Sequence, residues 1–206
     1  MQRSSSPLLL VVALVLSLHW VPAAFADNLV QNPGFESGFT SWSESGFGLY
    51  GPLQVHGGAL AADTGCVGPD CISSTTGAYL QQTLYTIAGE PYDLSFWVAE
   101  NSGPMSEMAV FWNGNMIADV PNPASDACIG RFTICHFVEY VFPGLVPTGN
   151  ATVLRINGRQ DPGYIIFDDF SVTPVEADPA LEPAGVTLMA AGTLAALVVL
   201  RRRFKR

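Results

Sequence analysis

Short apolar segments alternate with turn residues along the middle of the chain. Between residues 92 and 98 an apolar side chain stands at every second position, the spacing that sends successive side chains to opposite faces of a strand. Similar short segments cover Leu29-Val30, 109–112, 116–120, 137–142, 152–156 and 164–172. Glycine and proline separate these segments, and no long helical period runs through them. The pattern predicts an all-β fold, an antiparallel β-sandwich of short strands.

Turn residues locate the connections between the strands. Asn113-Gly114-Asn115 separates two apolar segments, and Asn-Gly readily supplies the positive φ angles of a tight hairpin. Pro143-Gly144 and Asp161-Pro162-Gly163 are interpreted as breaks between further strands.

The two ends of the chain differ from the middle. Residues 1–26 carry Arg3, an apolar run from Leu8 to Leu18 and a small-x-small site ending at Ala26, which is the order of a cleaved signal peptide. Residues 184–200 carry no charge and are followed by a basic tail, 201–206. This arrangement predicts one C-terminal transmembrane helix with its basic end in the cytoplasm. The residues between these ends are therefore expected outside the cytoplasm.

The middle of the chain has the size of one domain and a strongly acidic balance. Residues 27–174 form the predicted domain, and 175–183, rich in Pro, Ala and acid, form a linker. Eighteen acidic residues between Asp27 and Glu182 face three arginines there, a formal charge of −15. Such a surface excludes nucleic acid as a partner.

All four cysteines fall in the predicted exported part. They are Cys66, Cys71, Cys128 and Cys135, and an even number in an oxidising compartment indicates disulfides. We expect the local pairs Cys66–Cys71 and Cys128–Cys135, because closing a short loop is the simplest geometry. Crossed pairing is the alternative.

Several phrases, read in order, resemble the jelly-roll domains of bacterial PEP-CTERM proteins, which are similar to carbohydrate-binding modules of the galactose-binding-like fold. The domain opens with Asn-Pro-Gly-Phe-Glu (32–36) and closes with Asp-Asp-Phe-Ser-Val (168–172). The other matching phrases are 55–58, 80–82, 89–97 and 111–114, together with Trp42. The resemblance implies a jelly roll that binds carbohydrate.

The tail resembles the sorting signal of the same proteins, in which a Pro-Glu-Pro motif precedes an apolar helix and an arginine cluster. Here the motif is Leu181-Glu182-Pro183, with leucine where the first proline is usual. The resemblance implies an exosortase-like processing enzyme as a partner. If that enzyme does not recognise the altered motif, the tail is retained as a plain membrane anchor.

Similar jelly rolls also hold a structural calcium ion. The matching positions are Glu36, just after the first strand, and Asp168 or Asp169 in the last strand. Carboxylates and backbone carbonyls suit this hard cation. Alternation places Asp168 with Ile166, Phe170 and Val172 on an otherwise apolar face, where a carboxylate requires compensation. The alternative to calcium is a carboxylate satisfied by loop amides.

Sugar binding requires an aromatic ring face beside polar groups. Trp97 and Trp112 are the candidates, and the alternative for each is ordinary core packing. Neither His56 nor His136 belongs to a recognisable catalytic motif. The sequence therefore predicts a non-catalytic module on the periplasmic face of the membrane, the cell surface or the extracellular matrix, with polysaccharide as its partner. The competing prediction is a structural or adhesive surface protein that binds another protein or nothing specific.

Overall fold

The computed structural model describes residues 27–100, 105–123 and 136–176. This part of the chain forms strands and one short 3-10 helix, η1 (Pro69–Ile72). The strands are β1 (Ser43–Ser45), β2 (Gly48–Tyr50), β3 (Ala61–Thr64), β4 (Tyr79–Leu84), β5 (Tyr92–Glu100), β6 (Met105–Trp112), β7 (Asn115–Pro121), β8 (Val138–Leu145), β9 (Thr152–Asp161) and β10 (Ile165–Pro174). No helix among these residues is long and apolar enough to cross a membrane.

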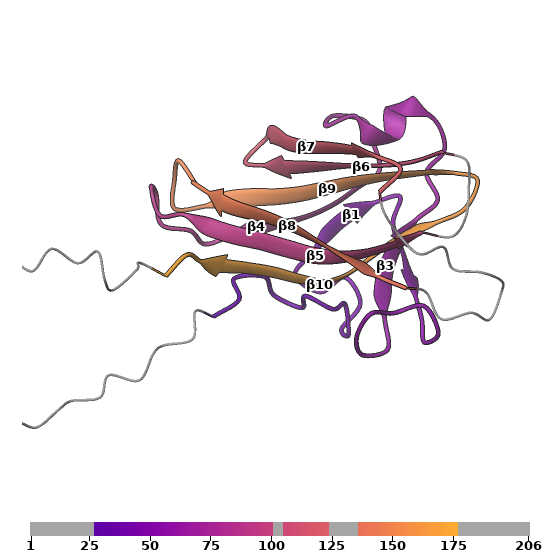
Figure 1. Ribbon diagram of the computed structural model, residues 1–206, viewed down its shortest axis with the longest axis horizontal. Helices are drawn as coiled ribbons and strands as arrows, with labels where there is room; N and C mark the ends of the chain where they lie inside the picture. The colour runs from indigo at the N-terminus through magenta and orange to yellow at the C-terminus, as the bar shows by residue number, and fades with distance from the viewer. Residues whose placement is uncertain (1–26, 101–104, 124–135, 177–206) are drawn as a thin grey trace, which may run out of the picture.

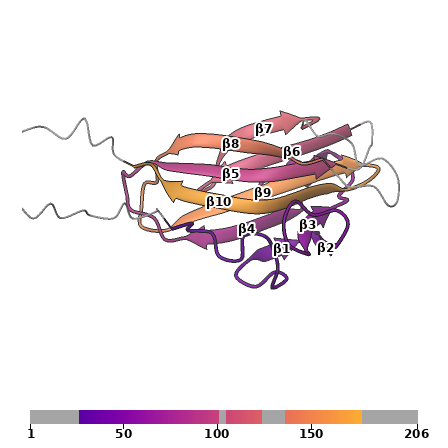
Figure 2. The same cartoon turned by 60° about the horizontal axis from the view of Figure 1, so that its bottom comes forward.

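The strands form two layers, which Figures 1 and 2 show from two sides. One sheet has the order β1-β4-β9-β6-β7 and the other the order β2-β3-β10-β5-β8. All strand pairs are antiparallel. The predicted antiparallel β-sandwich is therefore confirmed.

The core lies between the two sheets, and both contribute alternate residues to it. Burial in β5 switches at nearly every residue, as expected for a strand with one face on the core. The central residues, each at most 1 % exposed, are Leu80, Leu84, Leu94, Phe96, Val98, Met108, Val110, Leu154, Ile156, Phe167 and Phe170.

The predicted hairpin is confirmed. Asn113 and Gly114 have φ angles of 51° and 81°, and Trp112 pairs with Asn115 across them. Two consecutive positive φ angles are typical of the type I′ turn, whose twist matches that of the strands it joins.

The predicted break at Pro143-Gly144 is wrong, because β8 continues through both residues to Leu145. Its register against β5 shifts at this point, and Gly144 has a φ of 69°. β8 lies at the edge of its sheet, where the missing N–H of a proline removes no ladder bond. Pro143 therefore lies in an irregular edge strand.

The predicted face of the last strand is also partly wrong. The register of β10 against β5 shifts between Asp168 and Ser171, and Asp169 has a φ of 46°. Such a bulge changes the alternation of faces. Phe170 and Val172 therefore join the main core, whereas Ile166 packs in a small separate cluster on the outer face.

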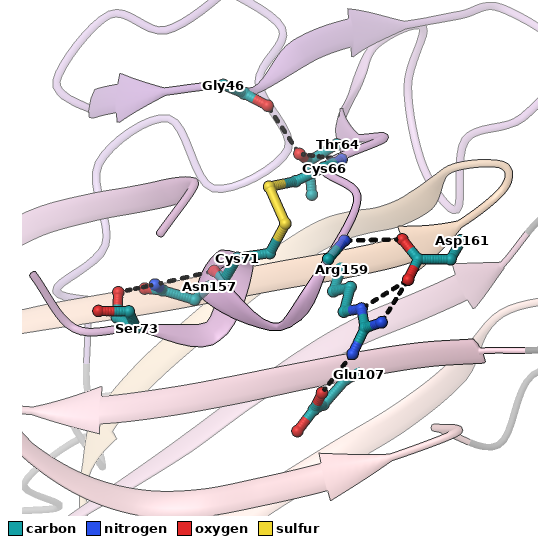
Figure 3. The surroundings of a disulfide bond; sticks show 10 residues. Gly46, Thr64, Cys66, Cys71, Ser73, Glu107, Asn157, Arg159 and Asp161 are labelled. Atoms are coloured by element: carbon teal, nitrogen blue, oxygen red, sulfur yellow. Dashed lines mark hydrogen bonds and ion pairs between the residues drawn. A yellow bond between two sulfur atoms is a disulfide. The ribbon is translucent and has the colours of Figure 1, made fainter. Parts of the chain in front are cut away.

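One predicted disulfide is confirmed. The sulfur atoms of Cys66 and Cys71 are 2.05 Å apart, and the bond ties the chain before η1 to η1 itself (Figure 3). Cys128 and Cys135 lie outside the described residues. So do the predicted signal peptide, the sorting motif, the apolar segment and the basic tail.

Candidate functional site

The bulge of β10 holds the loop before β3 through a buried carboxylate. Asp168 has no exposed surface. Its Oδ2 accepts hydrogen bonds from the amides of His56, at 2.8 Å, and Gly57, at 3.1 Å. Its Oδ1 accepts one from the amide of Asp169 at 2.8 Å. Burial raises the pKa of Asp168 to about 6, although these amide donors act in the opposite direction.

Glu36 binds the same loop a few residues further on. Its Oε1 accepts hydrogen bonds from the amides of Ala59, at 2.8 Å, and Leu60, at 3.1 Å. These two donors lower the pKa of the Glu36 carboxyl group, because they stabilise its ionised form. Asp168 of β10 thus holds the start of the loop 56–60, and Glu36 of the N-terminal segment holds its end.

Asp169 has a different partner. Its Oδ2 lies 2.6 Å from Nδ1 of His56, and the His56 ring stacks on Trp97 with centroids 3.9 Å apart and an angle of 12° between the planes. Phe137 contacts the same imidazole edge-on. The structure therefore brings Asp168, Asp169 and Trp97 together around the loop at His56.

The three acidic residues predicted to hold calcium have amide or imidazole partners. Within the described residues, no group of three or more histidine, cysteine or carboxylate side chains has an arrangement that could hold a metal ion. Glu36 and Asp168 direct oxygens at N–H donors of the loop. Calcium binding at these three residues therefore stays a prediction.

The two predicted sugar-binding tryptophans lie in different layers. Trp97 is half-buried on the outer face of its sheet, and one face of its ring lies against His56. Trp112 is only 5 % exposed and belongs to the main core. Trp112 alternates with Met108 and Val110, so the pleat turns it inward. Its ring face is closed to a ligand in this arrangement.

A hollow of about 350 Å³ lies on the outer face of the other sheet. Three of its residues stand side by side across three strands. Arg155 of β9 pairs with Gln81 of β4 on one side and with Phe111 of β6 on the other. The complete lining is Ser74, Gln81, Phe111, Asn113, Gly114, Val153 and Arg155.

Arg155 is the charged residue of this hollow. Its Nε donates to Oδ1 of Asn157 at 2.8 Å, and its guanidinium carbon lies 4.2 Å from the centre of the Tyr79 ring. Its Nη2 is buried without a hydrogen-bond partner. Burial lowers the pKa of Arg155, because a cation loses solvation inside the protein.

Asn157 connects this strand to the disulfide region. The side chain is fully buried, and its Nδ2 donates to the carbonyls of Cys71, at 3.3 Å, and Ser73, at 2.8 Å (Figure 3). Because Ser74 lines the hollow, these bonds position one of its walls.

Sequence reasoning missed the hollow because its residues come from separate strands. The one local signal was Phe111, which alternates with the inward Val110 and Trp112 and therefore had to face outward. The pairing of Gln81 with Arg155 depends on which strands are neighbours, and no local pattern gives that information.

Comparisons with known proteins support the fold. No family model matches the chain, and no curated protein matches it. Among solved structures, TmCBM61 in complex with β-1,4-galactotriose is similar at 20 % identity and a TM-score of 0.51, with 73 % of this chain and all of that chain covered. The K1 cleaved adhesin domain of Lys-gingipain from Porphyromonas gingivalis W83 is similar at 16 % identity and a TM-score of 0.50, with 69 % of this chain and 96 % of that chain covered. The described domain therefore shares its jelly-roll sandwich fold with a carbohydrate-binding module.

Proposed function

We propose that this chain is an exported, surface-anchored and non-catalytic module that binds carbohydrate through the hollow on the β4-β9-β6 face. The observation that carries the proposal is the row of Gln81, Arg155 and Phe111 across three adjacent strands. It combines an aromatic side chain with hydrogen-bonding groups in one depression.

This combination suits the chemistry of a sugar. Pyranose rings present C–H groups on their faces and hydroxyl groups at their edges, so they require apolar contact beside polar partners. Phe111 and Val153 supply apolar surface, while Gln81 and Asn113 carry amides that both donate and accept. The site is set on paired strands, which hold these groups at fixed spacings.

The non-catalytic role is supported by the lining itself. None of the seven residues around the hollow is a carboxylate, a histidine or a cysteine. Glycoside hydrolysis normally uses a pair of carboxylates flanking the scissile bond. The groups present suit binding and orientation.

Export and anchoring are supported by the sequence at both ends. Residues 1–26 have the order of a signal peptide, and 184–206 combine an apolar segment with a basic end. The Cys66–Cys71 disulfide suits an oxidising compartment. The proposed location is the periplasmic face of the membrane or the cell surface, with an exosortase-like enzyme acting at Leu181-Glu182-Pro183.

A glycan panel tests the proposal with the full chain in detergent. We expect the wild type to bind a subset of glycans and Gln81→Ala to bind them about tenfold more weakly, because one hydrogen-bonding side chain is worth roughly 1.4 kcal/mol here. Thr83→Ala is the matched control, because Thr83 is exposed two residues along the same strand and lies outside the hollow.

The tryptophan hypothesis is tested in the same panel. Trp97→Ala leaves binding unchanged if the hollow is the site and weakens it if the outer face of the other sheet is used. Equal binding by wild type and Gln81→Ala contradicts the proposed site. A panel without any bound glycan contradicts carbohydrate binding and favours the structural or adhesive alternative.

A further inference from the structure

The two arginines within the described residues have different surroundings. Arg159 pairs with Asp161 and, at 3.7 Å, with Glu107 (Figure 3). Arg155, four residues earlier on the same strand, has no carboxylate partner in this part of the chain. In a segment with a formal charge of −15, an arginine without an acidic partner is unexpected, and it lines the hollow.

The contacts of Arg155 leave its charge uncompensated. The Nε bond to Asn157 and the Tyr79 ring are neutral partners, and Nη2 has no acceptor. A cation held partly out of water without a counter-charge carries a desolvation cost. An anionic group in the hollow offsets that cost, and it would meet the guanidinium at Nη1, because Nε is bonded to Asn157 and Nη2 is buried.

The remaining lining defines what kind of anion fits. Gln81 and Asn113 bring amides for hydroxyl groups, and Phe111 and Val153 bring apolar surface, so the ligand requires a ring with hydroxyls as well as a charge. No acidic side chain lines the hollow. A carboxylate on a sugar therefore meets no repelling group inside it.

We propose that the hollow binds a sugar residue that carries a carboxylate, a uronic acid, and that Arg155 recognises this carboxylate. This proposal rests on the proposed function and names its ligand class. The negative charge of the domain repels densely charged polymers at long range. The site thus suits uronic residues scattered along an otherwise neutral polysaccharide.

Matched pairs of sugars test this proposal with the full chain. The probes are methyl β-D-glucuronide against methyl β-D-glucoside, and methyl β-D-galacturonide against methyl β-D-galactoside, because each pair differs only in a carboxylate against a hydroxymethyl group. Ligand-observed NMR gives the dissociation constants. We expect the acid of at least one pair to bind about tenfold more tightly, as a charge-assisted pair with arginine allows. The neutral methyl ester of that acid is expected to lose the advantage.

Two substitutions localise the effect. Arg155→Gln is expected to bind acid and neutral sugar equally. Arg159→Gln removes the same charge from the same strand outside the hollow and is expected to keep the preference. Melting curves establish that both variants are folded, and the ester comparison in the wild type requires no variant.

The outcomes separate the two proposals. Binding of glycans without preference for the acid, or a preference that survives in Arg155→Gln, overturns the uronic-acid inference and leaves carbohydrate binding intact. Failure of every sugar, acids included, together with a negative glycan panel overturns both.

Discussion

The carboxyl groups of the domain differ in whether the folded structure raises or lowers their pKa. Asp161 is held ionised by Arg159, which lowers its pKa. Asp63 is 6 % exposed, and burial raises its pKa from 3.8 to about 6. The acidic residues of the domain therefore include groups whose ionised form stabilises the folded state and groups whose ionised form destabilises it.

The substitution Asp63→Asn tests the effect of a carboxyl group whose ionised form opposes folding. The folded pKa is raised, so between about pH 4 and pH 6 the folded protein holds a proton that the unfolded chain has lost. The stability that protonated Asp63 gives the folded wild type is therefore lost as the pH rises through 6. We expect Asp63→Asn to be more stable than the wild type at pH 7 to 8 and the gain to vanish near pH 4. Urea unfolding at several pH values measures it.

The control for charge is Asp70→Asn, the same change at an exposed position in η1. A stability difference for Asp63→Asn that is independent of pH, or one that grows toward pH 4, contradicts this prediction.

The residues Glu36, Asp168 and Asp169 also carry the calcium hypothesis. If these residues bind calcium, we expect the melting temperature to rise on addition of CaCl2 and to fall again with EDTA. A ligand that binds only the folded state stabilises that state. Elemental analysis of the purified protein provides an independent measurement. Equal melting temperatures and no bound metal leave the loop amides as the partners of these carboxylates.

At the level of the elements, the β6–β7 hairpin forms a turn of the fold and also lines the proposed binding site. Asn113 and Gly114 form its turn and also line the hollow. A change in turn geometry is therefore expected to affect both folding and ligand affinity.

Gly114→Ala isolates this effect. A Cβ at Gly114 meets no atom within 4 Å, so the cost comes from the φ of 81° alone. We expect a loss of about 1 kcal/mol in unfolding free energy and weaker glycan binding. Gly149→Ala is the control, because a Cβ there makes only an ordinary contact at 4.0 Å and its φ is not in the positive range. Equal stability of both variants contradicts the prediction.

The sequence predicted elements well where the signal was local. The hairpin followed from Asn113-Gly114, and β5 followed from strict alternation. The bulge at Asp169 was missed because an aspartate rarely adopts a positive φ and nothing in Asp168-Asp169 signals it. The hollow was missed because the register of β4, β9 and β6 brings its residues together. The pairing of strands that are distant in the sequence thus determines the hollow, and the local sequence pattern does not contain this information.

At the level of the whole molecule, the domain has its two ends together. Leu29 donates its amide to the carbonyl of Val172, and Asn28 bonds the backbone of Phe170 and Val172. Figures 1 and 2 show that the chain enters and leaves the described domain on the same side.

Export gives a prediction at this scale. We expect the protein made in a bacterial host with a secretion system to begin at Asp27, because Ala24 and Ala26 offer the small residues that signal peptidase requires. Intact mass measurement and N-terminal sequencing check the cleavage. Ala26→Trp is expected to block it. A cytoplasmic protein that keeps Met1 contradicts export.

The position of β10 affects how the domain bears mechanical force. This last strand lies between β3 and β5, with hydrogen bonds on both sides, and it leads directly to the C-terminal segment. A pull on that segment acts along the strand axis and loads many of these bonds at once, in shear. Under the proposed anchoring and carbohydrate binding, a domain tethered through this strand resists drag on a bound polymer, because no single bond has to yield first.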